Sequence, residues 1–274
     1  MTVKIAFEQV RKVFPVQGTT GSRRATEFTA LDGIDLEISA GEFMVVVGPS
    51  GCGKSTLLDL LGGLTPPTGG RILLDGEPVT GPGLDRGIVF QSYALLPWRT
   101  ALGNVEFGLE ATGVPRRRRA ERAREYLDLV GLSGFEDRHP HELSGGMRQR
   151  VAIARSLAYD PDVLLMDEPF AALDAQTREL LQDELLRIWE RTGKTVVFIT
   201  HGIEEAVYLG QRVAVLTSRP GVVKEVVPIA LDARTTADDV RSSPEFAHHR
   251  HRIWSLLQDE VARAQQLEKE SVPA

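Results

Sequence analysis

The sequence lacks the features of a secreted or membrane-spanning chain. Its 274 residues include a single cysteine, Cys52, so no disulfide can form within one chain. No run approaches the roughly 20 apolar residues that cross a bilayer as a helix. Residues 1–14 alternate polar and apolar side chains and lack the long apolar core of a secretory signal. These absences favour a reducing cytoplasm, and any role at a membrane has to come through a partner.

An excess of positive charge is also missing. Lys and Arg total 32 against 38 Asp and Glu, which gives a formal net charge of −6. Surfaces that bind nucleic acid are basic because they neutralise phosphates, so the composition argues against nucleic acid as the main partner. The hydrophobic content of 42% is ordinary for a soluble globular protein, and the length suffices for one large domain or two lobes.

The chain does contain a glycine-rich stretch that fits G-x-x-x-x-G-K-[ST]. It reads Gly48-Pro49-Ser50-Gly51-Cys52-Gly53-Lys54-Ser55-Thr56. An apolar run at 43–47 predicts a buried strand before it, and residues 57–61 favour a helix after it. Glycines let backbone N–H groups close around a β-phosphate, and the helix N-terminus adds partial positive charge. Lys54 can reach the β- and γ-phosphates, and the Ser55 hydroxyl can ligate Mg²⁺. This order predicts a nucleoside triphosphate site, the alternative being a glycine turn that merely precedes a helix.

Alternating strand and helix patterns predict the rest of the fold. Residues 3–14 and 31–38 alternate like half-exposed strands, with a polar loop at 18–29 between them. Further strands are predicted at 71–76, 87–90, 163–167, 195–199, 212–217 and 222–227, and helices at 116–130, 144–157 and 173–191. We therefore expect a mostly parallel sheet covered on both faces, a smaller antiparallel layer beside it, and a helical insert at about 92–156.

The tail, residues 228–274, is predicted as a separate unit. Ser243-Pro244 is typical of an N-cap followed by proline at the first helical position. One helical face, expected to pack on a core of its own, carries Phe246, Ile253, Leu257, Val261 and Ala264. The nearby His248, His249 and His251 are expected to be solvated, because no carboxylate or thiol is placed to complete a metal site.

Two acidic residues end the predicted strand at 163–167. At the carboxyl end of a parallel strand, Asp167 would face a metal ion through water. Glu168 comes one residue later and could orient or deprotonate an attacking water. The alternative is an acidic pair that ends a core strand.

A second predicted helix start offers another anion site. It reads Leu143-Ser144-Gly145-Gly146-Met147-Arg148-Gln149-Arg150. The two glycines leave backbone N–H groups bare, and Ser144 adds a hydroxyl. A nucleotide has one γ-phosphate, already held by the first stretch, so we hypothesise a head-to-tail pair in which Ser144 of one copy closes over ATP on the other. The alternative is a Ser-capped helix whose glycines serve close packing.

Together these motifs resemble the ATP-binding cassette (ABC) ATPases. Residues 143–150 look like the signature motif of that family, ahead of residues 164–169, and the resemblance covers about residues 4–225. It implies an α/β P-loop NTPase (RecA-like) core with an antiparallel β subdomain, an α-helical subdomain and a C-terminal helical extension. Residues 1–227 would form the ATPase domain and residues 228–274 the extension. The implied cofactors are ATP and Mg²⁺.

The resemblance also assigns single residues. It implies that Gln91 senses Mg²⁺ and joins the core to the helical lobe, and that Asp174 lies where two copies exchange contacts. It implies that His201 touches the γ-phosphate and that Phe14 stacks on adenine. Each has a structural alternative: a solvated strand end for Gln91, a satisfied strand-end histidine for His201, and a core aromatic for Phe14.

Two positions depart from the family pattern. Met147 stands where many relatives carry glutamine, a position at which other residues are tolerated. Gly202 follows His201 where aspartate is common. The resemblance implies that this glycine would loosen the loop that carries His201, called the switch loop below.

Four segments resemble the nitrate/sulfonate/taurine branch of importer ATPases, at 81–87, 93–100, 201–207 and 218–221. In that branch the stretch from Leu95 to Thr100 lines a groove for a short helix of the membrane subunit. An exposed Trp98 beside Arg99 suits such a surface, whereas Leu95 and Leu96 could equally pack inside the helical lobe. The run at 116–119 is predicted as a solvated helix start, with lipid head groups as the alternative partner.

The resemblance implies the ATP-hydrolysing subunit of an importer, a head-to-tail homodimer that ATP closes. It would lie peripherally on the cytoplasmic face of the inner membrane, with transmembrane permease subunits and, indirectly, an extracytoplasmic solute-binding protein as partners. Those partners select the solute. The alternatives are an exporter ATPase, which would lack the 97–100 and 218–221 segments, and a soluble ABC ATPase, which typically carries long coiled-coil insertions or two cassettes.

Overall fold

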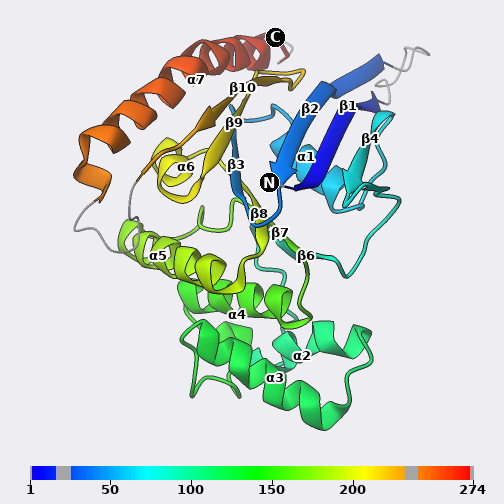
Figure 1. The fold of residues 1–274 in the computed structure, drawn as a ribbon, viewed down its shortest axis with the longest axis vertical. Coiled ribbons are helices and arrows are strands. Elements are labelled where there is room, and N and C mark those ends of the chain that lie inside the picture. Colours follow the sequence, from blue (N-terminus) through cyan, green and yellow to red (C-terminus); the bar gives the residue numbers. More distant parts are fainter. Residues whose placement is uncertain (1, 17–25, 232–239, 272–274) are drawn as a thin grey trace. The chain divides into compact units, whose positions relative to one another are not determined.

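A computed structural model of the chain describes residues 2–16, 26–231 and 240–271. The chain divides into two compact units (Figure 1). The first unit takes residues 1–82 and 198–274, and the second takes residues 83–197. Strand β8 (Thr195–Thr200) therefore begins in the second unit and ends in the first.

The first unit contains an antiparallel sheet with the strand order β2-β1-β4-β5. Its strands are β1 (Val3–Val16), β2 (Thr26–Ser39), β4 (Gly69–Leu74) and β5 (Glu77–Pro78). Alternate side chains of β1, such as Ile5 and Phe7, are buried because successive side chains of a strand point to opposite faces. The predicted antiparallel layer is confirmed.

The predicted loop at 18–29 is wrong at its C-terminal end. Residues 26–29 belong to β2, where Phe28 pairs with Phe14 and Thr29 pairs with Val13. The polar composition suggested a loop, but threonine and phenylalanine favour strands, and pairing with β1 satisfies their backbone groups. Residues 18–25 of that predicted loop lie outside the described residues.

A parallel strand pair carries the core of the first unit. β3 (Phe43–Val47) and β9 (Arg212–Leu216) pair in parallel, and β10 (Val223–Pro228) pairs antiparallel with β9. All five residues of β3 are buried, as expected of a strand covered on both faces. The helices are α1 (Lys54–Leu61), α6 (Ile203–Leu209), the 3-10 helix η2 (Val240–Ser242) and α7 (Pro244–Ser271).

Helix α7 is part of the first unit, so the expectation that the tail packs on a core of its own is wrong. Its start is as predicted, because the Phe246 backbone N–H donates to the Ser243 hydroxyl at 3.1 Å. Phe246, Ile253 and Leu257 are buried, and the helix packs against α6 and β9 (Figure 1). The apolar stripe marked a buried face but could not reveal which surface would bury it.

The three histidines at the start of α7 differ in burial. His248 and His251 are exposed, as predicted. His249 is half-buried, and its Nε2 atom lies 3.4 Å from the Ala230 carbonyl oxygen.

The second unit combines two parallel strands with a helical cluster. β6 (Arg86–Val89) pairs in parallel with β7 (Val163–Asp167). The helices are α2 (Ala101–Ala111), α3 (Arg116–Leu129), the 3-10 helix η1 (Pro140–Glu142), α4 (Gly145–Ala158) and α5 (Ala175–Thr192). α2, α3 and α4 pack on one another, and they appear in shades from blue-green to green in Figure 1.

Helix α2 was not identified from the sequence as a separate element. It contains Gly103 and Gly108, and glycine weakens the helical signal because it loses the most backbone entropy on folding. Gly108 has a packing role, since a Cβ atom there would lie 2.4 Å from the Tyr159 ring. Thr100 caps the helix by accepting a hydrogen bond from the Gly103 N–H at 3.2 Å.

Among the residues that the structure describes, no helix combines the length and apolarity that crossing a membrane requires.

Candidate functional site

The glycine-rich stretch forms the loop between β3 and α1 in the first unit. Gly51 (φ 72°) and Gly53 (φ 100°) adopt left-handed backbone conformations that glycine enters without steric cost. A Cβ atom on Gly53 would lie 2.7 Å from Leu31 Cδ2, and one on Gly48 would lie 2.7 Å from Cys52 Sγ. The loop is therefore wound too tightly for larger residues at these positions.

Lys54 lies folded back over this loop. The residue is only 7% exposed, and its Nζ donates to the carbonyl oxygens of Gly48 and Pro49, both at 2.9 Å. Burial raises the pKa of the Cys52 thiol, against the opposing charge of Lys54, so the thiol stays protonated at neutral pH. An ammonium group that rests on two neutral carbonyls can gain stronger, charge-assisted hydrogen bonds from a phosphate. At the start of α1, Ser55 is exposed.

His201 follows the end of β8 and is exposed. The turn after it is held by Thr200, whose hydroxyl accepts a hydrogen bond from the Gly202 N–H at 2.9 Å and donates to the Glu205 carboxylate. His201 and residues 48–50 of the glycine-rich loop line one cavity of about 300 Å³. The structure thus brings together two of the sequence-predicted elements, although about 150 residues separate them.

Gly202 adopts an ordinary backbone conformation (φ −85°, ψ 113°) at the start of α6. A Cβ atom there would lie 3.4 Å from both the Glu205 Cβ and the Thr200 hydroxyl, which is normal contact. The backbone at this position therefore does not require glycine. The predicted loosening of the switch loop stays a prediction.

In the second unit, Asp167 is the last residue of β7 and Glu168 follows it. Both are half-buried. Glu168 has φ 42°, a left-handed conformation that is rare for a residue other than glycine. Such strained residues concentrate at functional sites, where the surrounding structure imposes them. The sequence gives no sign of this strain.

Gln91 is exposed just beyond β6, and a strained turn follows it. Tyr93 (φ 61°) and Ala94 (φ 46°) are both left-handed. Arg155 of α4 donates to the carbonyl oxygens of Ala94 at 2.5 Å and Tyr93 at 3.0 Å. Arg155 was missed by sequence reasoning, since only the fold brings it to a loop 61 residues away. It braces the segment that presents Gln91.

The predicted second anion site is the start of α4. Ser144 is exposed, and its hydroxyl accepts a hydrogen bond from the Met147 N–H at 3.2 Å. A Cβ atom on Gly145 would lie 3.2 Å from Leu173 Cδ2, and one on Gly146 would lie 2.8 Å from the Thr177 methyl. Serine capping and close glycine packing are therefore both present, and the role of Ser144 toward a phosphate stays a prediction.

The start of α4 also contacts the Gln91 loop. The Arg148 guanidinium stacks on the Tyr93 ring at 5.6 Å and donates to the Leu143 carbonyl at 2.7 Å. One arginine thus links the turn after Gln91 to the residue before Ser144. The two segments therefore share one side chain as a contact.

Asp174 is exposed and caps α5. Its carboxylate accepts a hydrogen bond from the Thr177 N–H at 2.9 Å. Backbone hydrogen bonds, the largest from Thr177, hold the pKa of Asp174 below its usual range. It is therefore an ionised cap at neutral pH.

Phe14 lies in β1 of the first unit and is 37% exposed, so the alternative that it is a core residue is wrong. Its ring centroid lies 6.4 Å from that of Phe28, and the Lys12 ammonium lies 5.0 Å from the Phe14 ring. The free part of the ring can stack on another planar group.

The loop before α2 presents an apolar surface. Trp98 is 72% exposed, as predicted, whereas Leu95 and Leu96 are half-buried. Arg99 stacks on Phe107 at 5.3 Å and donates to Glu110 at 2.9 Å, and this hydrogen bond holds the pKa of Glu110 below its usual range. Phe107 is 48% exposed and extends the surface, but its position within a helix gave no signal in the sequence.

The buried Asn104 side chain shapes the same loop. It accepts a hydrogen bond from the Leu96 N–H at 2.8 Å and donates to the Arg99 and Thr100 carbonyls at 3.1 and 3.0 Å. These bonds satisfy a backbone that has no regular partners, so the loop is fixed with Trp98 outward.

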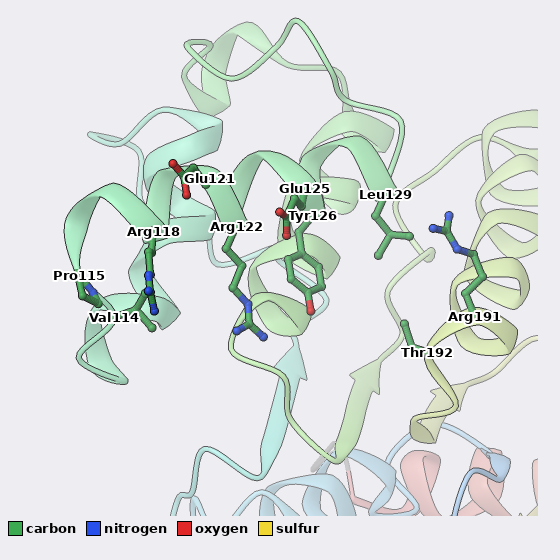
Figure 2. Close-up of a pocket in the computed structure, with 10 residues that line it drawn as sticks. All are labelled: Val114, Pro115, Arg118, Glu121, Arg122, Glu125, Tyr126, Leu129, Arg191 and Thr192. Atoms are coloured by element: carbon green, nitrogen blue, oxygen red, sulfur yellow. The ribbon is translucent and has the colours of Figure 1, made fainter.

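A separate cleft of about 670 Å³ lies against α3 and the end of α5 (Figure 2). Figure 2 shows Arg118, Arg122 and Tyr126 on one side of α3, at a spacing of four residues, with Arg191 contributed by α5. None of the residues predicted for the nucleotide site lines this cleft.

The arginine run that starts α3 is only partly solvated. The Arg117 side chain is 94% exposed, and Arg116 and Arg118 are exposed, as predicted. Arg119 departs from the prediction, because its side chain is 20% exposed and pairs with Glu110 at 3.2 Å.

Comparison with known proteins defines the class of this one. The family model described as "ABC transporter" matches residues 31–171. An ABC transporter ATP-binding protein of Methanocaldococcus jannaschii, uncharacterised, is 54% identical over 264 residues, which cover 96% of this chain and 95% of the relative. The chain belongs to the ABC transporter family and is an ATP-binding ATPase of it.

Two further relatives place it within that family. The nitrate import ATP-binding protein of a Synechocystis strain is 52% identical, over 83% of this chain and 88% of the relative. The taurine import ATP-binding protein of Pseudomonas putida is 51% identical, over 84% and 90%. The resemblance to the nitrate/sulfonate/taurine branch is confirmed.

A solved structure confirms the P-loop NTPase fold. It is a dimeric ATP-binding cassette in a post-hydrolysis state, bound to ADP and phosphate. It superposes with a TM-score of 0.71 at 35% identity and covers 82% of this chain and 99% of that chain.

Proposed function

We propose that this chain is the ATP-hydrolysing subunit of an ABC importer for a small solute of the nitrate, sulfonate or taurine type. The observation that carries the proposal is a pair of different helix starts in one chain: α1 behind the Lys54 loop and α4 behind Ser144. A single triphosphate has one γ-phosphate, which the Lys54 loop of one copy would already hold. The Ser144 end is used as well if it comes from a second copy that shares the same triphosphate. The relatives named for nitrate and taurine import support the importer branch.

The first unit supplies the phosphate cradle. The N-cap residue of helix α1 is Gly53, which makes no side-chain cap, and the N–H groups of a helix's first turn are donors that a phosphate can use. Lys54 would exchange its two carbonyl partners for β- and γ-phosphate oxygens. His201, on the same cavity, would contact the γ-phosphate, and the free face of Phe14 would stack on adenine.

The second unit supplies the hydrolytic groups. By the family resemblance, Ser55, Gln91 and Asp167 are the residues that would hold Mg²⁺. When bound, that ion neutralises charge on the transferring phosphoryl group. Glu168 would orient the attacking water and accept its proton. The water oxygen then bonds to the γ-phosphorus, the bond to the β–γ bridging oxygen breaks, and ADP and phosphate leave.

A second copy completes each site. Its Ser144, Gly145 and Gly146 would approach the γ-phosphate from the side opposite Lys54, and Asp174 would lie where the copies exchange contacts. These donors meet only in the closed dimer, so ATP shifts the population toward closure. Arg148 and Tyr93 connect the start of α4 to the Gln91 loop, so closure would also move that loop.

The exposed pair Trp98 and Phe107 would receive the permease. In this arrangement residues 1–227 form the ATPase domain, with the helical subdomain at about 92–156, and residues 228–274 form the C-terminal extension. The chain lies peripherally on the cytoplasmic face of the inner membrane. A solute-binding protein outside that membrane delivers the solute to the permease.

The test is Glu168→Gln. Because general-base groups contribute about 100-fold or more, the variant is expected to hydrolyse ATP at least about 100-fold more slowly while still binding ATP and forming an ATP-dependent dimer. Steady-state phosphate release and sedimentation velocity measure the two properties. Glu125→Gln, which neutralises an exposed carboxylate on α3, is the control and should hydrolyse ATP normally. Near-normal hydrolysis by Glu168→Gln would remove Glu168 from this role.

A further inference from the structure

Helix α7 forms one wall of the cavity at the phosphate loop. The cavity of about 300 Å³ has residues 48–50 and His201 on one side, and α7 contributes Trp254, Leu257 and Val261 on the other. The sequence placed the tail in a separate unit, so this neighbourhood was unexpected. It puts the last helix of the chain beside the residues that would hold the γ-phosphate.

Among the α7 residues that line the cavity, Trp254 is an aromatic side chain partly exposed to solvent. Leu257 is buried and Val261 is half-buried, whereas Trp254 is 50% exposed. A large aromatic ring half-open to water, beside the exposed His201 and the half-buried Ile203, has the character of an interface anchor.

This wall is fixed in place by polar contacts. Glu260 is 2% exposed and accepts a hydrogen bond from the Ser218 N–H at 2.9 Å, while Lys224 Nζ lies 2.8 Å from its other oxygen. Nearer its start, α7 is tied to α6 by the Arg250–Glu204 pair at 3.0 Å. A helix anchored around Leu257 and Val261 is preorganised for a partner.

The proposed function determines which partner reaches this face. In the proposed dimer, a second copy that brings Ser144 to a phosphate held by Lys54 and His201 would approach beside residues 48–50, which line the same cavity as His201. Those residues share their cavity with Trp254, so the docking face continues onto α7. A cavity of this size takes one or two side chains of that copy, not a separate domain.

We propose that α7 belongs to the surface on which the second copy docks, with Trp254 as its anchor. This rests on the proposed ATP-dependent dimer. The helix is then a working part of the ATPase, and the closed dimer buries the Trp254 ring.

The experiment measures the dissociation constant of the dimer by sedimentation velocity, in Mg·ATP and in the Glu168→Gln background. Adding Trp254→Ala is expected to weaken the dimer at least about 10-fold, because central aromatic anchors dominate interface energies. Trp254→Phe, which keeps an apolar ring, should recover most of the affinity. ATP affinity of the monomer and thermal stability should stay close to the parent for both, because Trp254 is half-exposed.

Leu267→Ala is the matched control, since Leu267 is an exposed apolar residue of the same helix that lines a different cleft, beside Arg219 and Pro220. It should leave the dimer unchanged. If Trp254→Ala dimerises as tightly as the parent, the inference is wrong while the proposed function stands. A tighter dimer would also overturn it, because α7 would then obstruct docking. If the Glu168→Gln parent forms no dimer with ATP, the proposed function itself fails.

Discussion

The starts of α1 and α4 resemble each other in sequence but are built differently. Both starts combine serine and glycine, and both were predicted to bind a phosphate. The start of α1 has no side-chain cap and is preceded by Gly53 in a left-handed conformation. The start of α4 is capped by Ser144, which accepts from the Met147 N–H, and its glycines pack against neighbouring side chains.

The difference indicates how the two ends would be used. The N-cap residue of α1 is a glycine that makes no side-chain cap, which suits a cradle that binds the nucleotide phosphates within one copy. In the first turn of α4 the Met147 N–H already donates to the Ser144 hydroxyl, so a phosphate at that donor has to share or replace the Ser144 contact. That suits a weaker contact, made only when a second copy arrives.

The largest expected effect is on ATP affinity at the start of α1, which has no side-chain cap. Lys54→Ala removes the ammonium group that now rests on the Gly48 and Pro49 carbonyls. Hydrogen bonds to charged groups contribute about 1.5–3 kcal/mol, so ATP affinity should fall about 100-fold. Isothermal titration with Mg·ATP measures this, and Lys194→Ala, which removes a lysine that pairs with Asp160, is the control. Unchanged affinity would falsify the phosphate-cradle assignment.

The Ser218 backbone N–H contrasts with the start of α1, because it already donates to a carboxylate of the same chain. This N–H donates to Glu260 of α7, and hydrogen bonds from Lys224 and Ser218 lower the Glu260 pKa to about 2 against the opposing effect of burial. Because the folded-state pKa is lowered, the stabilisation is complete above about pH 4.5 and is lost as the pH falls toward 2.

Glu260→Gln keeps an acceptor but loses the charge, so the free energy of unfolding at pH 7 should fall by about 2 kcal/mol. Urea denaturation at pH 7 and at pH 3 measures the loss, which should be smaller at pH 3. Glu245→Gln, at the exposed start of α7, is the control. An equal loss at both pH values would mean that the charge contributes nothing.

Ser144→Ala tests the capped end. Loss of an N-cap hydroxyl costs about 1 kcal/mol of stability. ATP affinity of the monomer should be unchanged, whereas the ATP-dependent dimer in the Glu168→Gln background should weaken. Denaturation, titration and sedimentation separate these three readouts. A drop in monomer ATP affinity comparable to that of Lys54→Ala would show that the two helix starts do not differ as argued.

The smallest effect is expected at the third helix start, that of α5. Asp174 caps it as an ionised carboxylate with a lowered pKa, so its stabilisation is present above the ordinary aspartate range and fades as the pH falls through the lowered value. Asp174→Asn keeps the cap without the charge. It should alter thermal stability slightly at pH 7, and the effect should shrink as the pH falls below the ordinary aspartate range. A shift of equal size at pH 7 and below that range would contradict an ionised cap.

Several site features could be predicted from the sequence because they are local. The order of strand, glycine turn, lysine and hydroxyl is typical of phosphate-binding loops. The structure places Lys54 and Ser55 at the start of α1, as expected. The Ser243 cap was predicted, and the Ser144 cap was the stated alternative for its helix start, because capping involves residues three apart in the chain.

Features that depend on distant segments were missed. Arg155 reaches the strained Tyr93-Ala94 turn from α4, and no local pattern marks either partner. The left-handed backbone conformation of Glu168 also has no signal in the sequence, because backbone strain is imposed by the surrounding packing. Phe107 joins Trp98 at the surface only because α2, which the glycines concealed, folds there.

By itself the sequence determined the phosphate loop, the acidic strand end, the signature-like helix start and the family they define, since each consists of neighbouring residues with fixed chemistry. Only the tertiary structure decided that α7 lies beside His201 and the phosphate loop. The physical reason is that an apolar helical stripe specifies that it must be buried but not against what. The position of α7 is determined by its packing on α6 and β9 and by the hydrogen bonds of Glu260 with Ser218 and Lys224.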